Sequence, residues 1–193
     1  MIRKTILLYI MLILILSPAN AYAAPEKDGK INFVQSIGGV DDKLVQEFND
    51  SYMLIPENVR ERFEEDGWKI YATTENLGQK YYGKKMSILA LTVTDEQAIY
   101  IDDREKARYS VIHEMGHYID FSSDFVSGTE EFEEIFNEEA DDFRSFHETH
   151  KNNTSTAVEY FAESYQAMIT ETEEMMEKCP KTYQFIAKYA DAF

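Results

Sequence analysis

Apolar residues recur at helical spacing through the second half of the chain. The pattern covers residues 104–121, 130–147, 156–170 and 181–190. Apolar side chains at this spacing fall on one face of a helix, which is typical of helices that pack on a core. Four helices are therefore expected after residue 103.

The first half of the chain contains two further helical patterns. Asp41 or Asp42 is placed to cap the first, while Pro56 suits the first turn of the second, which ends at Gly67. The inward positions are Leu44, Val45 and Phe48 in the first and Val59 and Phe63 in the second.

Three short runs rich in β-branched and aromatic residues separate the two groups of helices. They cover residues 68–74, 86–93 and 97–102, and the polar turn Thr94–Asp95–Glu96 joins the last two. The stretch "TTENLGQKYYGKK" between the first two runs is expected to be a loop. N-terminal helices and a small mixed sheet, followed by further helices, indicate a single α+β domain.

The N-terminus has the pattern of a secretory signal peptide. Arg3 and Lys4 precede an uncharged apolar run from Ile6 to Leu16, which is shorter than the roughly 20 residues that span a membrane. Cleavage after Ala23 follows from the small residues around it. We therefore expect a signal peptide at 1–23, a flexible lead-in at 24–35 and one domain at 36–193.

Charge and cysteine content narrow the class of protein. The chain has 36 acidic and 19 basic residues and a net charge of −17. Nucleic acid and anionic membranes are therefore excluded as partners, and no stable membrane association is expected after signal cleavage. Cys179 is the single cysteine, so it makes no internal disulfide. The exported domain depends on its apolar core and on any metal that it binds.

The segment "YSVIHEMGHYIDFSSD" carries the clearest chemical signal. His113 and His117 are one helical turn apart and point the same way, so both imidazoles can reach one zinc ion. Glu114 lies beside that face, where it can act as the general base for attack by water. A zinc hydrolase is the function that this spacing predicts.

The residues after His117 exclude the extended three-histidine pattern, because Asp120 and Ser123 stand where a glycine and a third histidine would be. Asp120 lies on the same helix face as the histidines. Its carboxylate could accept the second ring N–H of one of them and fix the tautomer, or could simply cap the helix.

A third zinc ligand must then come from elsewhere in the chain. Glu159 and Glu163 are one turn apart in "VEYFAES", an apolar setting where a carboxylate needs a partner. Other pairs of glutamates at the same spacing lie on polar helix faces. Spacing alone leaves open which member of the pair would bind the ion and which would support a histidine.

Three ordered motifs, "HEMGHYID", "EYFAESYQAMI" and "CPKTYQFIAKYA", resemble the anthrax-toxin lethal-factor-like zinc metallopeptidases, which include secreted Pro-Pro endopeptidases. The resemblance covers approximately residues 40 to 193. It implies a gluzincin-type peptidase with one zinc ion bound by His113, His117 and Glu159, with Glu114 as the base and Glu163 supporting a histidine. It also implies a terminal helix around Cys179, with Tyr183 and Phe185 packed.

The chain departs from the family pattern in two places. Asn152 stands where members have a tyrosine that stabilises the oxyanion, and His150 is the preferred substitute over Tyr160. The 73–85 loop is shorter than the family's substrate loops and lacks their tryptophan, so cleavage between prolines is not implied. Tyr81 and Tyr82 of this loop are candidates for the substrate groove.

The expected function is that of a secreted, monomeric zinc endopeptidase that cleaves extracellular peptides or proteins. The resemblance places it outside a bacterial cell, of Gram-positive type. The alternative is an exported zinc-binding interaction or toxin-like module without catalysis, which the missing oxyanion tyrosine supports.

Overall fold

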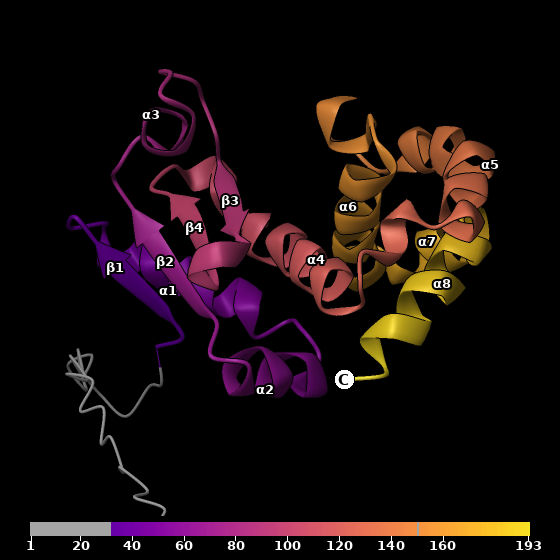
Figure 1. The fold of residues 1–193 in the computed structure, drawn as a ribbon, viewed down its shortest axis with the longest axis horizontal. Helices are drawn as coiled ribbons and strands as arrows, with labels where there is room; N and C mark the ends of the chain where they lie inside the picture. Colours follow the sequence, from indigo (N-terminus) through magenta and orange to yellow (C-terminus); the bar gives the residue numbers. More distant parts are fainter. Residues whose placement is uncertain (1–31, 150) are drawn as a thin grey trace, which may run out of the picture. The chain divides into compact units, whose positions relative to one another are not determined.

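In a computed structural model, which describes residues 32–149 and 151–193, four strands form one mixed sheet (Figure 1). Their order across the described sheet is β1-β2-β4-β3. β1 pairs in parallel with β2, β2 in parallel with β4, and β3 antiparallel with β4 at the edge. The strands are β1 (Val34–Ile37), β2 (Lys69–Thr73), β3 (Ala90–Val93) and β4 (Ala98–Asp102).

The two faces of the sheet bury different clusters. Ile70, Ile99 and Ile101 point into the main core. On the opposite face, Tyr71 and Tyr100 stack with ring centroids 5.4 Å apart and belong to a smaller cluster under α3 (Leu77–Tyr82). Successive side chains of a strand point to opposite faces of the sheet, so alternate residues belong to the main core and to the smaller cluster.

Helices cover the main-core face and continue away from it. The α4 helix packs on β3 and β4 on one side and on α6 on the other (Figure 1). The remaining C-terminal helices pack around α6. The helices besides α3 are α1 (Asp42–Tyr52), α2 (Glu57–Glu65), α4 (Ser110–Ser122), α5 (Glu130–Phe146), α6 (Ala157–Thr170), α7 (Thr172–Lys178) and α8 (Pro180–Ala190).

Short 3₁₀ turns connect several of these elements. They are η1 (Thr94–Glu96), η2 (Glu105–Ala107), η3 (Val126–Gly128) and η4 (Lys151–Thr154). The η4 turn ends shortly before Thr156, the N-cap of α6.

The α4 and α6 helices lie very close together where they cross. A Cβ built on Gly116 would lie 2.7 Å from the Cα of Ala162 and 3.0 Å from its carbonyl oxygen. Position 116 therefore requires glycine.

A buried carboxylate holds the C-terminal helix. Glu139 of α5 accepts hydrogen bonds from the backbone N–H of Lys181 (3.1 Å) and Thr182 (2.9 Å) and from the Thr182 hydroxyl (2.7 Å). These contacts satisfy N–H groups that the first turn of α8 leaves without helical partners. Phe185 packs against Phe132 with ring centroids 4.9 Å apart, as expected for a packed terminal helix.

The α+β class is confirmed, but three local expectations are corrected. A strand forms at Val34–Ile37, so the domain begins inside the predicted 24–35 lead-in. The predicted 73–85 loop contains α3, with Asn76 as its N-cap and Gly83 (φ 65°) closing it. The helix expected from residue 104 begins at Ser110, after η2.

Tertiary contacts explain the missed strand. The side-chain oxygen of Asn49 accepts hydrogen bonds from the backbone N–H groups of Phe33 and Val34, at 2.8 and 3.1 Å. Such a contact between distant residues leaves no periodic signal in the local sequence. The predicted signal peptide at 1–23 lies outside the described residues. Among residues 32–149 and 151–193, no helix is both long and apolar enough to cross a membrane.

Replacing Gly116 with alanine should force α4 and α6 apart. Overpacking of this kind costs about 1–3 kcal/mol, which exceeds the gain of up to about 1 kcal/mol in helix propensity. We therefore expect the free energy of unfolding in urea to fall. The control is Gly128→Ala, because a Cβ at Gly128 meets nothing within 4 Å. Equal stability of the two variants would contradict a tight crossing.

Candidate metal centre

Two histidines of α4 face one glutamate of α6. The rings of His113 and His117 have centroids 4.9 Å apart. The carboxylate of Glu159 lies 3.5 Å from Nε2 of His113 and 3.8 Å from Nε2 of His117. The donor atoms of these three residues all lie within 4.8 Å of one another. The structure therefore brings together the three predicted ligands.

This arrangement fits a zinc ion. Ligand atoms on a tetrahedral zinc with bonds of about 2.0–2.1 Å lie about 3.3 Å apart, close to the two distances above. Two imidazoles and one carboxylate are also a donor set of catalytic zinc sites, which leave the fourth position open. Glu159 is held in the first turn of α6, where its N–H donates to the Thr156 hydroxyl at 3.3 Å.

Glu163, one turn after Glu159, orients His113 from behind. Nδ1 of His113 donates to a carboxylate oxygen of Glu163 at 2.7 Å, which turns Nε2 toward Glu159. Burial acts to raise the pKa of Glu163, but hydrogen bonds from His113 and His147 outweigh it and hold the pKa well below its usual range. Glu163 is therefore a buried anion.

Glu114 lies beside the cluster, next to the edge strand. It is buried, and one carboxylate oxygen accepts a hydrogen bond of 2.6 Å from the hydroxyl of Thr92 in β3. Thr92 thus fixes the position of a carboxylate adjacent in sequence to His113.

Asp120 has a different partner from the one predicted. Its two carboxylate oxygens accept hydrogen bonds from the backbone N–H and the hydroxyl of Ser127, at 2.8 and 2.6 Å. The side chain therefore ties the end of α4 to η3, which corresponds to the capping alternative. The orienting carboxylate comes from Glu163 instead, because α6 crosses α4 on the side of the histidines.

The other predicted site residues are not in the cluster. Tyr160 is fully buried, and its hydroxyl lies 2.9 Å from that of Thr182, so it is part of the core. Tyr81 packs on Tyr100 across the opposite face of the sheet, and Tyr82 is exposed. His150 lies outside the described residues.

Sequence reasoning missed four residues around these carboxylates. Thr92 contacts Glu114 from β3. Nε2 of His147 lies 3.0 Å from a carboxylate oxygen of Glu163, and Nδ2 of Asn153 lies 3.2 Å from the other oxygen of that carboxylate. Nδ1 of His147 lies 2.7 Å from a carboxylate oxygen of Glu171. They belong to other elements than the histidines of α4, so no spacing rule selects them. That His147 directly follows a helix with apolar Phe143 and Phe146 was the available signal for its burial.

The two histidines of the cluster differ in charge preference. Burial acts to lower the pKa of His113, but hydrogen bonds to Glu159 and Glu163 outweigh it and raise the pKa to about 10. For His117 burial dominates, and its pKa is lowered. His113 therefore favours the cationic form and His117 the neutral form, and Nε2 of His113 faces the Glu159 carboxylate.

An HExxH helix that faces a glutamate from a later helix defines the class of gluzincin-type metallopeptidases. The family model described as anthrax toxin lethal factor, N- and C-terminal domain, matches residues 8–189. The chain belongs to this lethal-factor-like zinc metallopeptidase family, as its motifs predicted.

A solved structure has the same fold. It is that of the Pro-Pro endopeptidase PPEP-2 from Paenibacillus alvei, with a TM-score of 0.62 and 20% sequence identity over 81% of this chain and 96% of that chain. No curated protein is similar enough in sequence to match.

Zinc binding should release about one proton. The raised pKa of His113 means that its Nε2 must lose a proton before it can bind the ion, whereas His117 is already neutral. The apparent zinc affinity should therefore rise about tenfold per pH unit between roughly pH 6 and 8. Competition with a chromophoric chelator at several pH values measures this slope. An affinity independent of pH would contradict a protonated His113.

Proposed function

We propose that the protein is a secreted zinc-dependent endopeptidase in which His113, His117 and Glu159 bind the ion. The observation that carries this proposal is the convergence of these three side chains within 4.8 Å, beside a buried glutamate. Membership of the lethal-factor-like family supports peptide hydrolysis as the reaction. A zinc ion in this position would supply a Lewis acid that polarises the scissile carbonyl and acidifies water.

Glu114 acts as the general base. Its carboxylate takes a proton from the attacking water and passes it to the nitrogen of the leaving amine. The hydroxyl of Thr92 holds one of its oxygens at 2.6 Å, and the other oxygen would take the proton from water. Glu163 keeps Nδ1 of His113 protonated, so that Nε2 is the ligand atom.

The edge strand β3 offers a binding site for an extended peptide. β3 pairs only with β4 in the described sheet, so its other edge is free to pair with a substrate backbone. Thr92 of this strand contacts Glu114, which places the edge beside the base. A peptide added to β3 would therefore pass the candidate metal centre. Tyr81 and the exposed Tyr82 stay candidate groove residues, and His150 stays the predicted oxyanion donor.

Replacing Glu114 with alanine should remove proteolysis while zinc stays bound. Loss of a general base lowers kcat by roughly 10²–10⁴-fold, whereas the three ligands remain. Digestion of a peptide library that includes Pro-Pro sequences, with and without chelator, measures activity and substrate preference together. Zinc content is measured on the same samples.

The matched control is Glu61→Ala, an exposed glutamate of α2, which should keep full activity. Cleavage retained by Glu114→Ala would refute the assignment of the base. Zinc bound by the wild-type protein without chelator-sensitive cleavage of any library peptide would favour the alternative, a non-catalytic zinc-binding module.

We also propose that the protein is exported from a Gram-positive cell and acts as a monomer after removal of residues 1–23. The basic start, the short apolar run and the small residues before Ala24 support this. N-terminal sequencing of protein from the culture medium should begin at Ala24. Protein retained in the cell with an intact Met1 would contradict export.

A further inference from the structure

A second buried histidine lies behind the candidate metal centre. His147 follows the last turn of α5, and its side chain is 4% exposed. Nε2 of its ring is 3.0 Å from one carboxylate oxygen of Glu163, and Nδ1 is 2.7 Å from a carboxylate oxygen of Glu171. A continuous chain of polar contacts therefore runs from His113 through Glu163 and His147 to Glu171.

The contacts of His147 define its charge. Ionised carboxylates only accept hydrogen bonds, so a ring with a carboxylate at each nitrogen must donate from both and is a cation. Burial acts to lower the pKa of His147, but hydrogen bonding to Glu163 and the charges of Glu163 and Glu171 outweigh it, and the pKa is raised. The C-terminal end of α5 also favours a positive charge.

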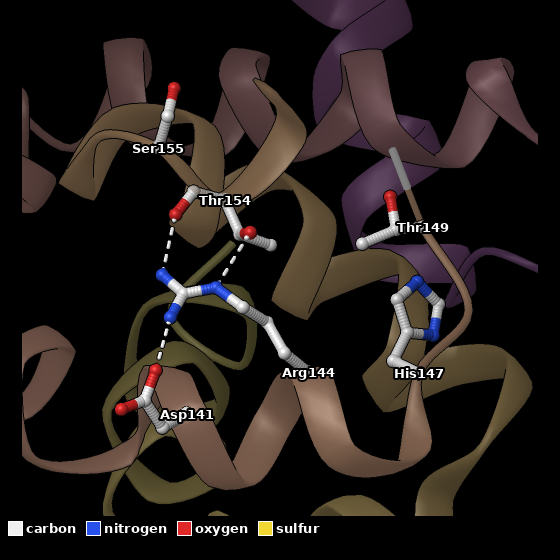
Figure 2. A pocket seen from close by; sticks show the side chains of 6 residues that line it. All are labelled: Asp141, Arg144, His147, Thr149, Thr154 and Ser155. Atoms are coloured by element: carbon white, nitrogen blue, oxygen red, sulfur yellow. Dashed lines mark hydrogen bonds and ion pairs between the residues drawn. The ribbon is translucent and has the colours of Figure 1, made fainter. Parts of the chain in front are cut away.

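The ring of His147 borders a cavity of about 590 Å³. Figure 2 shows this wall, with His147 and Thr149 on one side and Arg144 on the other. The ring also packs against Phe143, with ring centroids 4.9 Å apart, so packing and its two polar contacts together fix its orientation.

Arg144 supplies a second route from α5 to Glu163. Its Nε donates to the Thr154 hydroxyl at 3.0 Å and its Nη2 to the Thr154 carbonyl at 2.9 Å, while Nη1 contacts Asp141 (Figure 2). Thr154 ends η4, whose Asn153 donates to the same oxygen of Glu163 that accepts from His113. The last turn of α5 thus positions Glu163 directly and through η4.

We propose that His147 is a positioning residue for metal binding: held by Glu171 through one ring nitrogen, it donates through the other to the buried Glu163 carboxylate and keeps that carboxylate aligned on Nδ1 of His113. This inference rests on the zinc site of the proposed function. Glu163 is 3% exposed, and His113 and Asn153 contact one of its oxygens, so without His147 the carboxylate would lose the partner that holds its other oxygen at 3.0 Å. It would then be free to turn away from His113.

Replacing His147 with leucine should weaken zinc binding. Loss of a residue that orients a ligand from outside the coordination sphere costs about 10–100-fold in metal affinity. His147→Gln keeps one N–H donor toward Glu163 and loses the charge, so it should recover part of this loss. Zinc affinity is measured by competition with a chromophoric chelator, and circular dichroism gives the folded fraction of each variant.

The matched control is Glu139→Gln. Glu139 is a buried carboxylate of the same helix, and it accepts hydrogen bonds from the start of α8. Its replacement should lower the melting temperature and leave zinc affinity within about twofold of wild type, because its partners lie outside the chain of contacts to His113. Cobalt substitution adds a spectroscopic readout: His147→Leu should shift the visible absorption bands, and Glu139→Gln should not.

Wild-type zinc affinity in His147→Leu, or an equal loss in Glu139→Gln, would overturn the positioning role. If His147→Leu fails to fold, the comparison of His147→Gln with Glu171→Gln replaces it. Both remove the ionic contact with little change of shape, and both should weaken zinc binding; wild-type affinity in both would overturn the proposal. Failure of the wild-type protein to bind zinc would instead refute the metal site itself.

Discussion

The close crossing of α4 and α6 is the contact on which the rest of the site depends. Gly116 lies between the two histidines of α4, and Ala162 lies between the two glutamates of α6. The crossing therefore determines at once how far Glu159 stands from both histidine rings and how far Glu163 stands from the back of His113. A glycine inside a helix lowers the stability of the helix by up to about 1 kcal/mol relative to alanine. Here the glycine is needed because a larger residue would not fit at the short interhelical distance.

A row of side chains with alternating positive and negative charge extends from this crossing toward α5 and α7. A histidine of α4, a glutamate of α6, a histidine at the end of α5 and a glutamate at the start of α7 follow one another through short polar contacts. Each buried charge has an opposite charge beside it, which is the condition for burying ionised groups. The helices after α4 thus have an electrostatic role as well as a packing role: they neutralise and orient the carboxylate behind the candidate ligand.

Local patterns predicted much of this molecule and failed for physical reasons where they failed. The histidines of α4 and the paired glutamates of α6 were found because helical spacing and an apolar setting are visible in the sequence. His147 and Thr92 were not found, because each reaches its carboxylate from another element. The sequence left two roles open for Asp120, and it could not decide between them because it did not reveal that Ser127 folds back onto this side chain. The strand at Val34–Ile37 depends on Asn49, fifteen residues away from Val34.

The free edge of β3 has a consequence for solubility. An unpaired strand edge that can accept a peptide can equally accept the same edge of another copy of the chain. The strand is only four residues long, and the chain carries a net charge of −17, so two copies repel one another while short peptides of low charge do not. The net negative charge thus opposes pairing between the β3 edges of two copies of the chain.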